Sequence, residues 1–466
     1  MSEDKTLPVG WVATTLAELL LSPKSNIVDG PFGSNLKASE YQDNGTPILR
    51  LQNIKRFRFI SKNIKYILAS KSRELARHSY EPGDIIITKL GYPLGEACIL
   101  PNTIHAGIIV ADLVRLRLDN GHIDKKWLCY AINADDIANQ LKILTKGTTR
   151  PRVNLSHIRQ LEISLPPLKE QKRIVARVDE LFSELDKGIE NLKIAQEQLK
   201  VYRQAVLKHA FEGKLTADWR KKNGISEDWK WVKLAHLCTI TGGLTKNPKR
   251  SLFDRNIAYL RVANVQTNRL DLNDIQTIGI LDSEVDRVLL KKGDLLIVEG
   301  NGSIEHIGRV AVWNDEIPEM VHQNHLIKAR TNGAVDSRFI LYFLLSPKGR
   351  DIIKNVATST TGLHTLSISK VSNLIVPWCK VEEQQAIIEL LESYTSYIDR
   401  MVEEIETQLK KSEALRQSIL KKAFSGKLVA QDSKDEPASV LLECIRAEKG
   451  NSKDGSKKPR EKRKAA

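Results

Sequence analysis

The sequence contains few cysteines and no long apolar run. Its five cysteines lie dozens of residues apart and form no Cys-x-x-Cys pair, which is typical of thiols in a reducing cytosol and argues against a disulfide framework or a zinc site. The apolar stretches, such as those around Ile86 and Ile109, fall far short of the roughly 20 residues that a bilayer span needs. The first residues, MSEDKTLPVGW, contain no apolar signal core. We therefore expect a cytoplasmic protein that is neither exported by this route nor membrane-spanning.

The motifs that would hold a nucleotide, a cofactor or a metal are missing as well. The sequence has no Gly-x-x-x-x-Gly-Lys-Ser/Thr loop, since the Gly-Lys pairs at Gly213 and Gly426 are followed by leucine. It also has neither a Gly-x-Gly-x-x-Gly motif nor the Asn/Asp-Pro-Pro-Tyr/Phe pattern with which amino-methyltransferases hold a target amine. His322 and His325 have no third ligand nearby, which favours satisfied or DNA-facing histidines over a metal site. We expect a binding protein with no catalytic residue, metal or cofactor of its own.

The charge of the chain is basic but unevenly distributed. The 466 residues carry a formal net charge of +15, which is weak evidence for a nucleic-acid partner until the charges are located. Residues 449–464 hold eight Lys or Arg and two Asp or Glu, and we expect residues 431–466 to form a basic, disordered tail. In the rest of the chain the positive excess lies in residues 1–165 and 217–377, which carry net charges of +6 and +5. This division fits two separate contacts with an anionic partner.

Two copies of one unit make up the chain. RQAVLKHAFEGKL, which begins at Arg203, matches RQSILKKAFSGKL, which begins at Arg416, at nine of thirteen positions. At the same offset of 213 residues, the Glu-Gln pair at Glu170 aligns with the pair at Glu383, so the similar segment covers about fifty residues. Weaker similarities, such as that between ILRLQNI and YLRVANV, precede this segment. Each copy is therefore a variable globular part followed by a more similar helical part.

The helical parts place apolar residues at every seventh position, which predicts long coiled-coil helices. The heptad residues of the two copies are Val178, Leu185, Leu192, Leu199 and Val206, and Leu391, Ile398, Ile405 and Ile419. Prolines precede each helix, and Gly213 and Gly426 are candidate stops. We expect two helices of about 40 residues that pair antiparallel about a pseudo-twofold axis. The alternative is that each helix packs on its own globular domain.

These boundaries divide the chain into five parts. The predicted parts are globular domains over residues 1–165 and 217–377, helical spacers over 166–216 and 378–430, and the tail over 431–466. Short β-rich runs bounded by Gly, Pro and Asn predict that the globular parts are mixed α/β (α+β), with strands predominating. A helix over about residues 125–144, and its counterpart over about 336–354, interrupts the strands.

Loops rich in glycine, polar and basic residues lie between these strands. In such loops the backbone can approach phosphates and the side chains can reach base edges. Each residue taken singly is more often a solvated loop residue than a base contact, so the loops are stronger candidates as sets. The candidate DNA-binding residues are Lys24, Gly33, Ser34, Asn35, Lys37, Arg50, Gln52, Asn53, Lys89, Gly91, Tyr92, Lys146, Thr148, Thr149, Arg150 and Arg152 in the first copy, and Lys246, Lys249, Arg250, Arg261, Asn264, Asn301, Ser303, His306, Thr360, Thr361 and His364 in the second.

Several of these motifs together resemble a known family. They are the twofold repeat, the Pro-Pro-x-x-Glu-Gln entry at Pro166, the AFxGKL exits at Ala210 and Ala423, the LTADWR that follows the first exit, and DGPFGSNLK near the start. In this combination the chain is similar to the specificity subunit of a type I restriction-modification system, over about residues 7 to 442. The second copy departs from the entry pattern, with PWCKVEEQ in place of PPLKEQ.

The resemblance implies a non-catalytic subunit that recognises double-stranded DNA. It implies two target-recognition domains, each reading one half of an asymmetric bipartite site, and helices that hold their spacing and dock two methyltransferase subunits. Two restriction subunits would complete the complex, and S-adenosylmethionine, ATP and magnesium would belong to those partners. Two alternatives stay open, namely a stand-alone DNA-modifying enzyme with a degenerate active site and a coiled-coil scaffold without sequence specificity.

Overall fold

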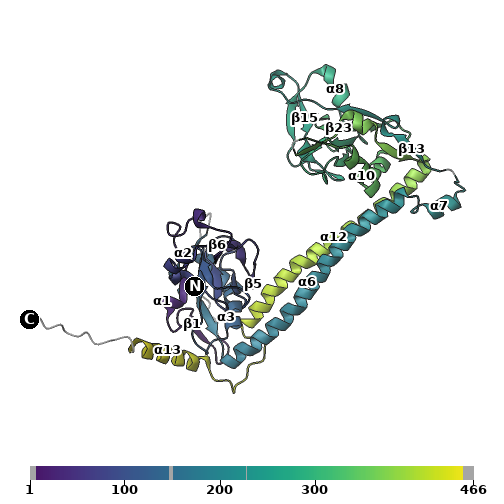
Figure 1. The fold of residues 1–466 in the computed structure, drawn as a ribbon. Helices are drawn as coiled ribbons and strands as arrows, with labels where there is room; N and C mark the ends of the chain where they lie inside the picture. Colours follow the sequence, from purple (N-terminus) through teal and green to yellow (C-terminus); the bar gives the residue numbers. More distant parts are fainter. Residues whose placement is uncertain (1–6, 146–150, 227, 361, 455–466) are drawn as a thin grey trace, which may run out of the picture. The chain divides into compact units, whose positions relative to one another are not determined.

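The chain forms two compact units that share two long helices. The structure, a computed structural model, describes residues 7–145, 151–226, 228–360 and 362–454. Unit 1 comprises residues 1–191 and 408–466, and unit 2 comprises residues 192–407. The long helices, α6 (Leu168–Phe211) and α12 (Val381–Ala423), contribute to both units (Figure 1).

Unit 1 contains two four-stranded sheets. The first has the order β2-β11-β8-β9 and is antiparallel throughout. The second has the order β6-β3-β10-β7, in which β10 runs parallel to β3. A further antiparallel pair, β1 with β12, brings the two ends of the globular part together, and β4 with β5 forms a hairpin. The strands are β1 (Val12–Thr15), β2 (Ile27–Asp29), β3 (Thr46–Leu49), β4 (Ile54–Lys55), β5 (Arg58–Phe59), β6 (Lys65–Ile67), β7 (Ser79–Tyr80), β8 (Ile85–Thr88), β9 (Ala97–Ile99), β10 (Gly107–Ile109), β11 (Leu113–Leu116) and β12 (Glu162–Leu165).

Unit 2 repeats this plan. Its sheets have the orders β14-β23-β19-β21 and β18-β15-β22, and β13 pairs with β26 as β1 pairs with β12. It adds a small sheet of order β20-β25-β24. The strands are β13 (Lys230–Lys233), β14 (Cys238–Gly242), β15 (Asn256–Leu260), β16 (Val265–Gln266), β17 (Arg269–Leu270), β18 (Gln276–Gly279), β19 (Leu295–Val298), β20 (Gly300–Asn301), β21 (Val310–Val312), β22 (Met320–His322), β23 (Leu326–Thr331), β24 (Thr358–Thr360), β25 (Leu363–Thr365) and β26 (Ile375–Trp378).

Both units also contain helices shorter than α6 and α12. Those of unit 1 are α1 (Pro23–Asn26), α2 (Ala69–Glu74), α3 (Lys125–Ile132), α4 (Asp135–Leu144), α5 (Leu155–Arg159) and α13 (Ala438–Asp454). Those of unit 2 are α7 (Ala217–Lys222), α8 (Asp282–Val288), α9 (Ser337–Leu345), α10 (Pro347–Val356) and α11 (Ile368–Ser372). The mixed, strand-rich architecture predicted for the two globular parts is confirmed.

Two predicted helices are each divided in two. The segment 125–144 breaks between α3 and α4, because the Asn133 side chain donates to the carbonyl of Cys129 and accepts from the amide of Ala97. The segment 336–354 breaks between α9 and α10, where Ser346 caps the amide of Gly349 and Pro347 begins the new helix. An amide or hydroxyl that bonds to the backbone competes with helix continuation at both places.

The long helices pair within each unit. In unit 1 the beginning of α6 packs against the end of α12, with Val178 and Leu420 fully buried in one core. In unit 2 the end of α6 packs against the beginning of α12, with Leu207 and Leu391 in the core. The predicted antiparallel pairing is therefore confirmed in each unit, and the same helix segments also pack on the globular parts, which the alternative anticipated. α6 ends at Phe211 and α12 at Ala423, just before glycines with left-handed φ angles of 70° and 68°.

The expectation of a disordered tail from residue 431 is wrong for its first part. Residues 438–454 form helix α13, and Ala438, Leu442 and Ile445 are buried in the core of unit 1. Asp435, just before the helix, forms an ion pair with Arg173 of α6 at 2.5 Å. Apolar residues at positions 438, 442 and 445 give the segment an amphipathic face, and this face outweighs its polar composition. No helix in the described part of the chain is long and apolar enough to cross a membrane.

Candidate nucleic-acid interface

Three predicted DNA-contacting loops of unit 1 lie beside one another. The loop after β8 pairs with the segment that precedes α5, through a β-bridge between Leu90 and Arg152. Lys89 in the same loop reaches Asp29, the last residue of β2, from which the glycine-rich loop begins. Strand pairing therefore gathers three segments from distant parts of the sequence into one surface.

The basic side chains on this surface are paired with acids. Lys89 is buried and forms an ion pair with Asp29 at 2.5 Å, and Arg152 forms an ion pair with Asp112. A DNA phosphate would have to compete with these carboxylates, so both residues stay predictions as DNA contacts. Tyr92, in contrast, is 80% exposed and presents its ring to solvent next to the paired charges.

A cavity of about 420 Å³ in unit 1 brings the glycine-rich loop together with a fourth predicted segment. Gly33 lines it from the loop after β2, and Arg50 and Gln52 line it from the start of the short helix η2 (Leu51–Asn53). Both side chains donate to the carbonyl of Asn63, Arg50 at 2.6 Å and Gln52 at 3.4 Å. Guanidinium and amide groups are the side-chain types that read guanine and adenine. The remaining predicted residues of the loop after β2, which are Ser34, Asn35 and Lys37, are exposed, as is Lys24 in α1.

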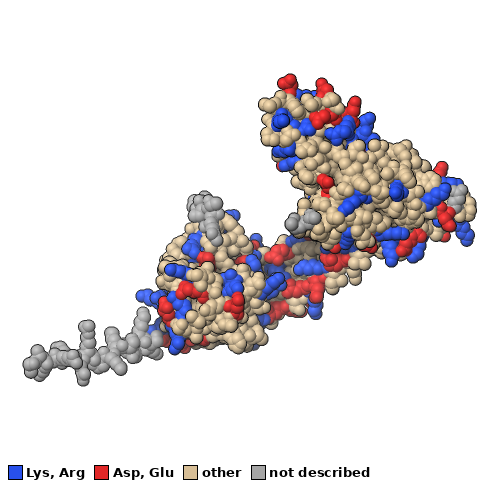
Figure 2. Space-filling view, turned by 45° about the horizontal axis from the view of Figure 1, so that its top comes forward, with Lys and Arg blue, Asp and Glu red and all other residues tan. Residues whose placement is uncertain are grey.

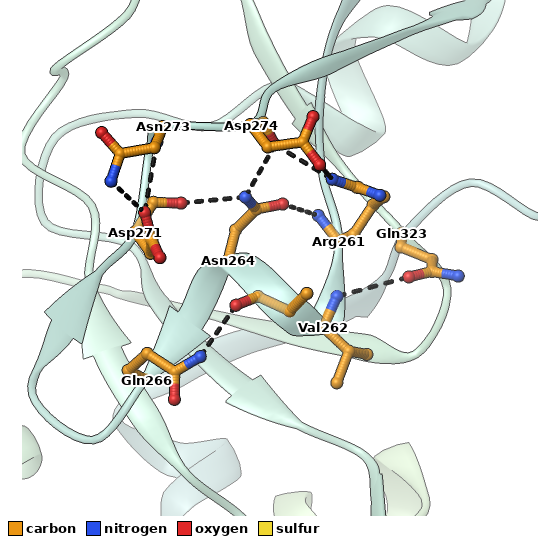
Figure 3. A network of polar contacts seen from close by, with 9 residues as sticks. Arg261, Val262, Asn264, Gln266, Asp271, Asn273, Asp274 and Gln323 are labelled. Carbon is orange, nitrogen blue, oxygen red and sulfur yellow. Dashed lines mark hydrogen bonds and ion pairs between the residues drawn. The ribbon is translucent and has the colours of Figure 1, made fainter. Parts of the chain in front are cut away.

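Asn264 is buried and closes a loop of unit 2. Its Oδ1 accepts from the backbone amide of Arg261 at 2.9 Å, and its Nδ2 donates to the carbonyls of Asp271 and Asp274 at 2.8 and 3.0 Å (Figure 3). The Arg261 guanidinium forms an ion pair with Asp274 at 2.6 Å. A base contact by the Asn264 amide would break three hydrogen bonds, so in this arrangement its effect on DNA passes through the position of Arg261.

Asn53 makes the matching contacts in unit 1. Its Oδ1 accepts from the amide of Arg50 at 3.0 Å, and its Nδ2 donates to the carbonyls of Ile60 and Lys62 at 2.9 and 3.1 Å. The side chain is fully buried. The two asparagines therefore hold the same turn in both units, and the side chains they hold in place are Arg50 and Arg261.

The predicted loops of unit 2 also converge, in a different form. β20 pairs with β25, which places Asn301 opposite His364, and β25 pairs with β24. The loop that follows β20 continues through Ser303, whose amide donates to Asn301 Oδ1 at 2.9 Å, to the exposed His306. The small sheet thus replaces the simple loop pairing of unit 1.

The basic loop of residues 241–250 contains two kinds of side chain. Lys246 and Lys249 are exposed. Arg250 is buried, with a bidentate contact to Glu284 at 2.8 and 3.0 Å. Arg250 therefore stabilises unit 2 in the structure, and the two lysines are the residues of this loop that present their charge to solvent.

Five predicted residues cannot be placed. Lys146, Thr148, Thr149, Arg150 and Thr361 lie outside the described residues. Thr360 belongs to β24 by its backbone.

Sequence reasoning missed a basic groove of unit 1. Lys24, Arg77, Arg115 and Arg117 line a cavity of about 560 Å³ beside β2 and β11. Arg115 and Arg117 are two positions apart at the end of one strand, a spacing that puts both side chains on one face of a sheet. Only Lys24 had been singled out, although the alternation of arginine in LVRLRL was a usable signal.

The long helices carry a different charge pattern from the loops. Figure 2 shows Lys and Arg interspersed with Asp and Glu over the visible face of the helices. Several of these charges form ion pairs within a helix, such as Arg177 with Glu180 and Lys200 with Glu197. Interspersed charges of both signs are less suited to the DNA backbone than the basic loops are.

Metal ligands and thiols were the remaining candidates for a reactive site among the described residues. The described residues contain no cluster of three or more His, Cys, Asp or Glu that could hold a metal ion. Burial raises the pKa of the Cys129 and Cys238 thiols to about 12, so neither is a thiolate near neutral pH. His322 is buried, and its Nδ1 lies 3.0 Å from the carbonyl of Leu326, to which it donates.

The sequence of this chain matches a family model described as "Type I restriction modification DNA specificity domain", over residues 34–194 and again over residues 226–411. The type I restriction enzyme EcoKI specificity subunit of Escherichia coli (strain K12) is 27% identical over 475 residues, which cover 97% of this chain and 98% of that protein. The StySPI specificity subunit of Salmonella potsdam is 25% identical over 468 residues, with the same coverage.

A solved structure has a similar fold. It comes from work on complex assembly and conformational transition of the type I R-M system, and the match covers 91% of this chain and 99% of the other. The TM-score is 0.65 at 20% sequence identity. The two halves matched by the family model correspond to the two globular parts and the long helices that follow them.

Proposed function

Because this chain belongs to the family of type I restriction modification DNA specificity domains, whose model matches both of its halves, we propose that it selects the DNA sequence on which a type I restriction-modification complex acts. Each unit contributes one recognition domain and reads one half of an asymmetric bipartite site. The observation that carries this proposal is one framework that displays two unlike sets of loops.

The framework is the same in both units down to single hydrogen bonds. The amide of Asp124, which caps α3, donates to Gln171 of α6 at 2.8 Å. The amide of Asp336, which caps α9, donates to Gln384 of α12 at 2.9 Å. Both glutamines are fully buried. A domain held on its helix in the same way in both copies supports one mode of DNA approach used twice.

The loops on this framework differ in sequence and in form. After β8, unit 1 presents Lys89, Gly91 and the exposed Tyr92. After β19, unit 2 presents Asn301 on the sheet β20-β25-β24 and Ser303 and His306 in the loop that follows β20. Since each base pair displays its own donors and acceptors in the major groove, unlike loops select unlike half-sites.

The helices supply spacing and docking in this proposal. α6 has 44 residues and α12 has 43, and both are continuous. We propose that they set the gap between the half-sites and bind two methyltransferase subunits, to which two restriction subunits are added. S-adenosylmethionine, ATP and magnesium act in those partners, and the chain itself is non-catalytic. Localisation in the cytoplasm follows from this role.

Selection from a randomised duplex library tests the proposal. The chain is purified with its methyltransferase subunits, bound duplexes are recovered and sequenced, and one asymmetric site with two specified parts and a fixed gap is expected. A chimera in which residues 217–377 are replaced by a second copy of residues 1–165 should select a symmetric site. Enrichment of one continuous sequence, or of none, would contradict the proposal.

The purified chain alone separates this function from the enzyme and scaffold alternatives. We expect no methyl transfer or DNA cleavage without partner subunits. Binding of the selected duplex should exceed binding of a scrambled duplex, and both should weaken as salt rises because phosphate contacts release counterions. A scaffold without sequence specificity would bind both duplexes equally.

A further inference from the structure

Three aromatic rings fill a space in unit 1 between the globular part and the long helices. Phe57 contacts Tyr130 and Phe182 with ring centroids 5.5 and 5.4 Å apart, and Tyr130 contacts Phe182 at 5.6 Å. All three contacts are edge-to-face. Arg416 lies over the Phe182 ring at 4.7 Å. The cluster closes this space with apolar surface.

Unit 2 has the same backbone at these positions but only one of the rings. Asn268 occupies the place of Phe57: both residues have a left-handed φ, 55° and 62°, and both amides donate at 2.9 Å, to Val310 and Ala97 respectively. Tyr342 on α9 takes the place of Tyr130. On the long helices, 213 residues separate Phe182 from Thr395 and Arg203 from Arg416. Unit 2 therefore has Asn268 in place of Phe57 and Thr395 in place of Phe182.

The loss of the two rings leaves a cavity of about 610 Å³ in unit 2. Asn268, Tyr342 and Thr395 line it together with Arg203. Ligand sites for small molecules have volumes of roughly 300–1,000 Å³. The cavity is thus large enough for a molecule that carries one aromatic ring and a polar group.

The cavity is also more basic than its counterpart. Arg309 and Arg350 line it, whereas the corresponding positions of unit 1 hold Glu96, which forms an ion pair with Lys55, and Ala138. Among the described residues neither arginine has a carboxylate within ion-pair distance. Arg350 donates to the carbonyls of Glu305 and Ile307, and Arg309 donates to the side-chain oxygen of Gln266 and the carbonyl of Val262.

Arg309 has unsatisfied hydrogen-bonding capacity as well. Its Nε is buried without a partner among the described residues. Partly buried charges with only neutral partners, and a buried donor with none, are costly and favour an anion nearby. Lys354 and Glu305 line the cavity as an ion pair at 2.7 Å, and Asp351 lines it as well, so Arg309 and Arg350 are the cations available to an anion.

We propose that this cavity binds a small ligand that combines an aromatic ring with an anionic group, of the size and chemistry of a nucleoside monophosphate. The ring lies against Tyr342, in the place that Phe57 and Phe182 fill in unit 1, and Arg203 faces it as Arg416 faces Phe182. The anionic group is held by Arg309 and Arg350. The proposal does not rest on DNA recognition. The residues that line the cavity all belong to unit 2, and His306 is the one candidate DNA-contacting residue among them.

Calorimetric titration of the full-length chain with adenosine 5'-monophosphate tests the proposal. Adenosine and inorganic phosphate serve as probes of the ring and the anion alone, and each should bind at least about tenfold more weakly than the monophosphate, because each lacks one of the two contacts. A single-stranded oligonucleotide is the fourth probe. Binding of the oligonucleotide but not of the monophosphate at millimolar concentration would overturn the assignment to a small ligand.

Filling the cavity supplies the decisive variant. The double variant Asn268→Phe and Thr395→Phe restores the rings of unit 1, so it should fold with an unchanged or raised midpoint of thermal unfolding and lose monophosphate binding. Arg350→Gln should weaken monophosphate binding by at least about tenfold while leaving the binding of adenosine unchanged. Lys142→Gln, at the unit 1 position that corresponds to Lys354, is the matched control and should change neither. Equal monophosphate binding by the filled variant and the wild type would refute the proposal.

Discussion

Arg203 on α6 forms an ion pair with Asp399 on α12. The repeat carries the same pair 213 residues further on, where Arg416 on α12 faces Asp186 on α6. Each pair lies within one unit. In unit 2 the arginine comes from α6 and the aspartate from α12, and in unit 1 the arginine comes from α12 and the aspartate from α6. The same reciprocity is expected wherever two copies of one segment pair antiparallel.

The two pairs differ in what surrounds the arginine, which predicts unequal effects of substitution. The Arg416 side chain is 13% exposed and lies over Phe182, whereas that of Arg203 is 34% exposed. Arg416→Gln should destabilise unit 1 by about 1–2 kcal/mol, since it loses a partly desolvated cation–π contact besides the ion pair. Arg203→Gln should destabilise unit 2 by less than about 1 kcal/mol. Hydrogen exchange of peptides from each unit, in increasing urea, measures both; equal losses would contradict the difference in environment.

Gln52 and Asn53 are adjacent, yet they should respond differently to substitution. Asn53→Ala removes three hydrogen bonds of a buried amide and should cost about 2–3 kcal/mol of unit 1 stability. Gln52→Ala should leave stability within about 0.5 kcal/mol and reduce the preference for the selected duplex over a scrambled one by about 1–3 kcal/mol. Urea unfolding and fluorescence anisotropy with the two duplexes measure these effects. If Gln52→Ala weakens both duplexes equally, Gln52 does not read a base.

These two residues show where sequence reasoning reaches its limit. Residues of the Arg-x-x-Asn type suit base reading by their donors and acceptors, but asparagine is equally suited to close a turn on the backbone. The repeat aligns Asn53 with Asn264 under both interpretations. Only burial separates the two interpretations, and burial of Asn264 goes with a loop that folds back to bring the carbonyls of Asp271 and Asp274 to its side chain, which the sequence does not show.

The long helices could be predicted because their signal is local. The heptad spacing that includes Val178 and Leu391, the absence of proline and the glycines after each helix are all read within one segment. The groove of Arg77, Arg115 and Arg117 could not be found in this way, because Arg77 comes to it from a separate segment. The cavity in unit 2 was missed for a similar reason, since Asn268, Tyr342 and Thr395 come to it from separate segments.

The C-terminal helix α13 should be required for the stability of unit 1 but not for that of unit 2. Ending the chain after residue 431 removes Ala438, Leu442 and Ile445 from the core, together with the ion pair between Asp435 and Arg173. Burial of Leu442 and of Ile445 contributes roughly 1.5–3 kcal/mol each, so peptides of unit 1 should exchange their amide hydrogens much faster. Peptides of unit 2 should be unchanged.

A chain that ends after residue 454 is the control for this truncation. It keeps every described contact of α13, among them the contacts of Lys449 with the carbonyls of Ala17 and Glu18. Exchange in unit 1 should then equal that of the full chain. If the chain that ends after residue 431 also exchanges faster in unit 2, α13 acts beyond the unit in which it packs.

His322 should make the stability of unit 2 depend on pH. Burial, reinforced by the nearby Lys328 ammonium, lowers its pKa from 6.5 to about 4. Below pH 6.5 the unfolded chain therefore takes up a proton that the folded chain refuses, so the stability is complete above that pH and is lost as the pH falls toward 4, by up to about 3 kcal/mol. His322→Gln should flatten this dependence in hydrogen exchange of unit 2 peptides, whatever its effect at neutral pH. His325→Gln, three positions along, replaces an exposed ring and should keep the dependence; a slope that survives in His322→Gln would assign the acid sensitivity to another group.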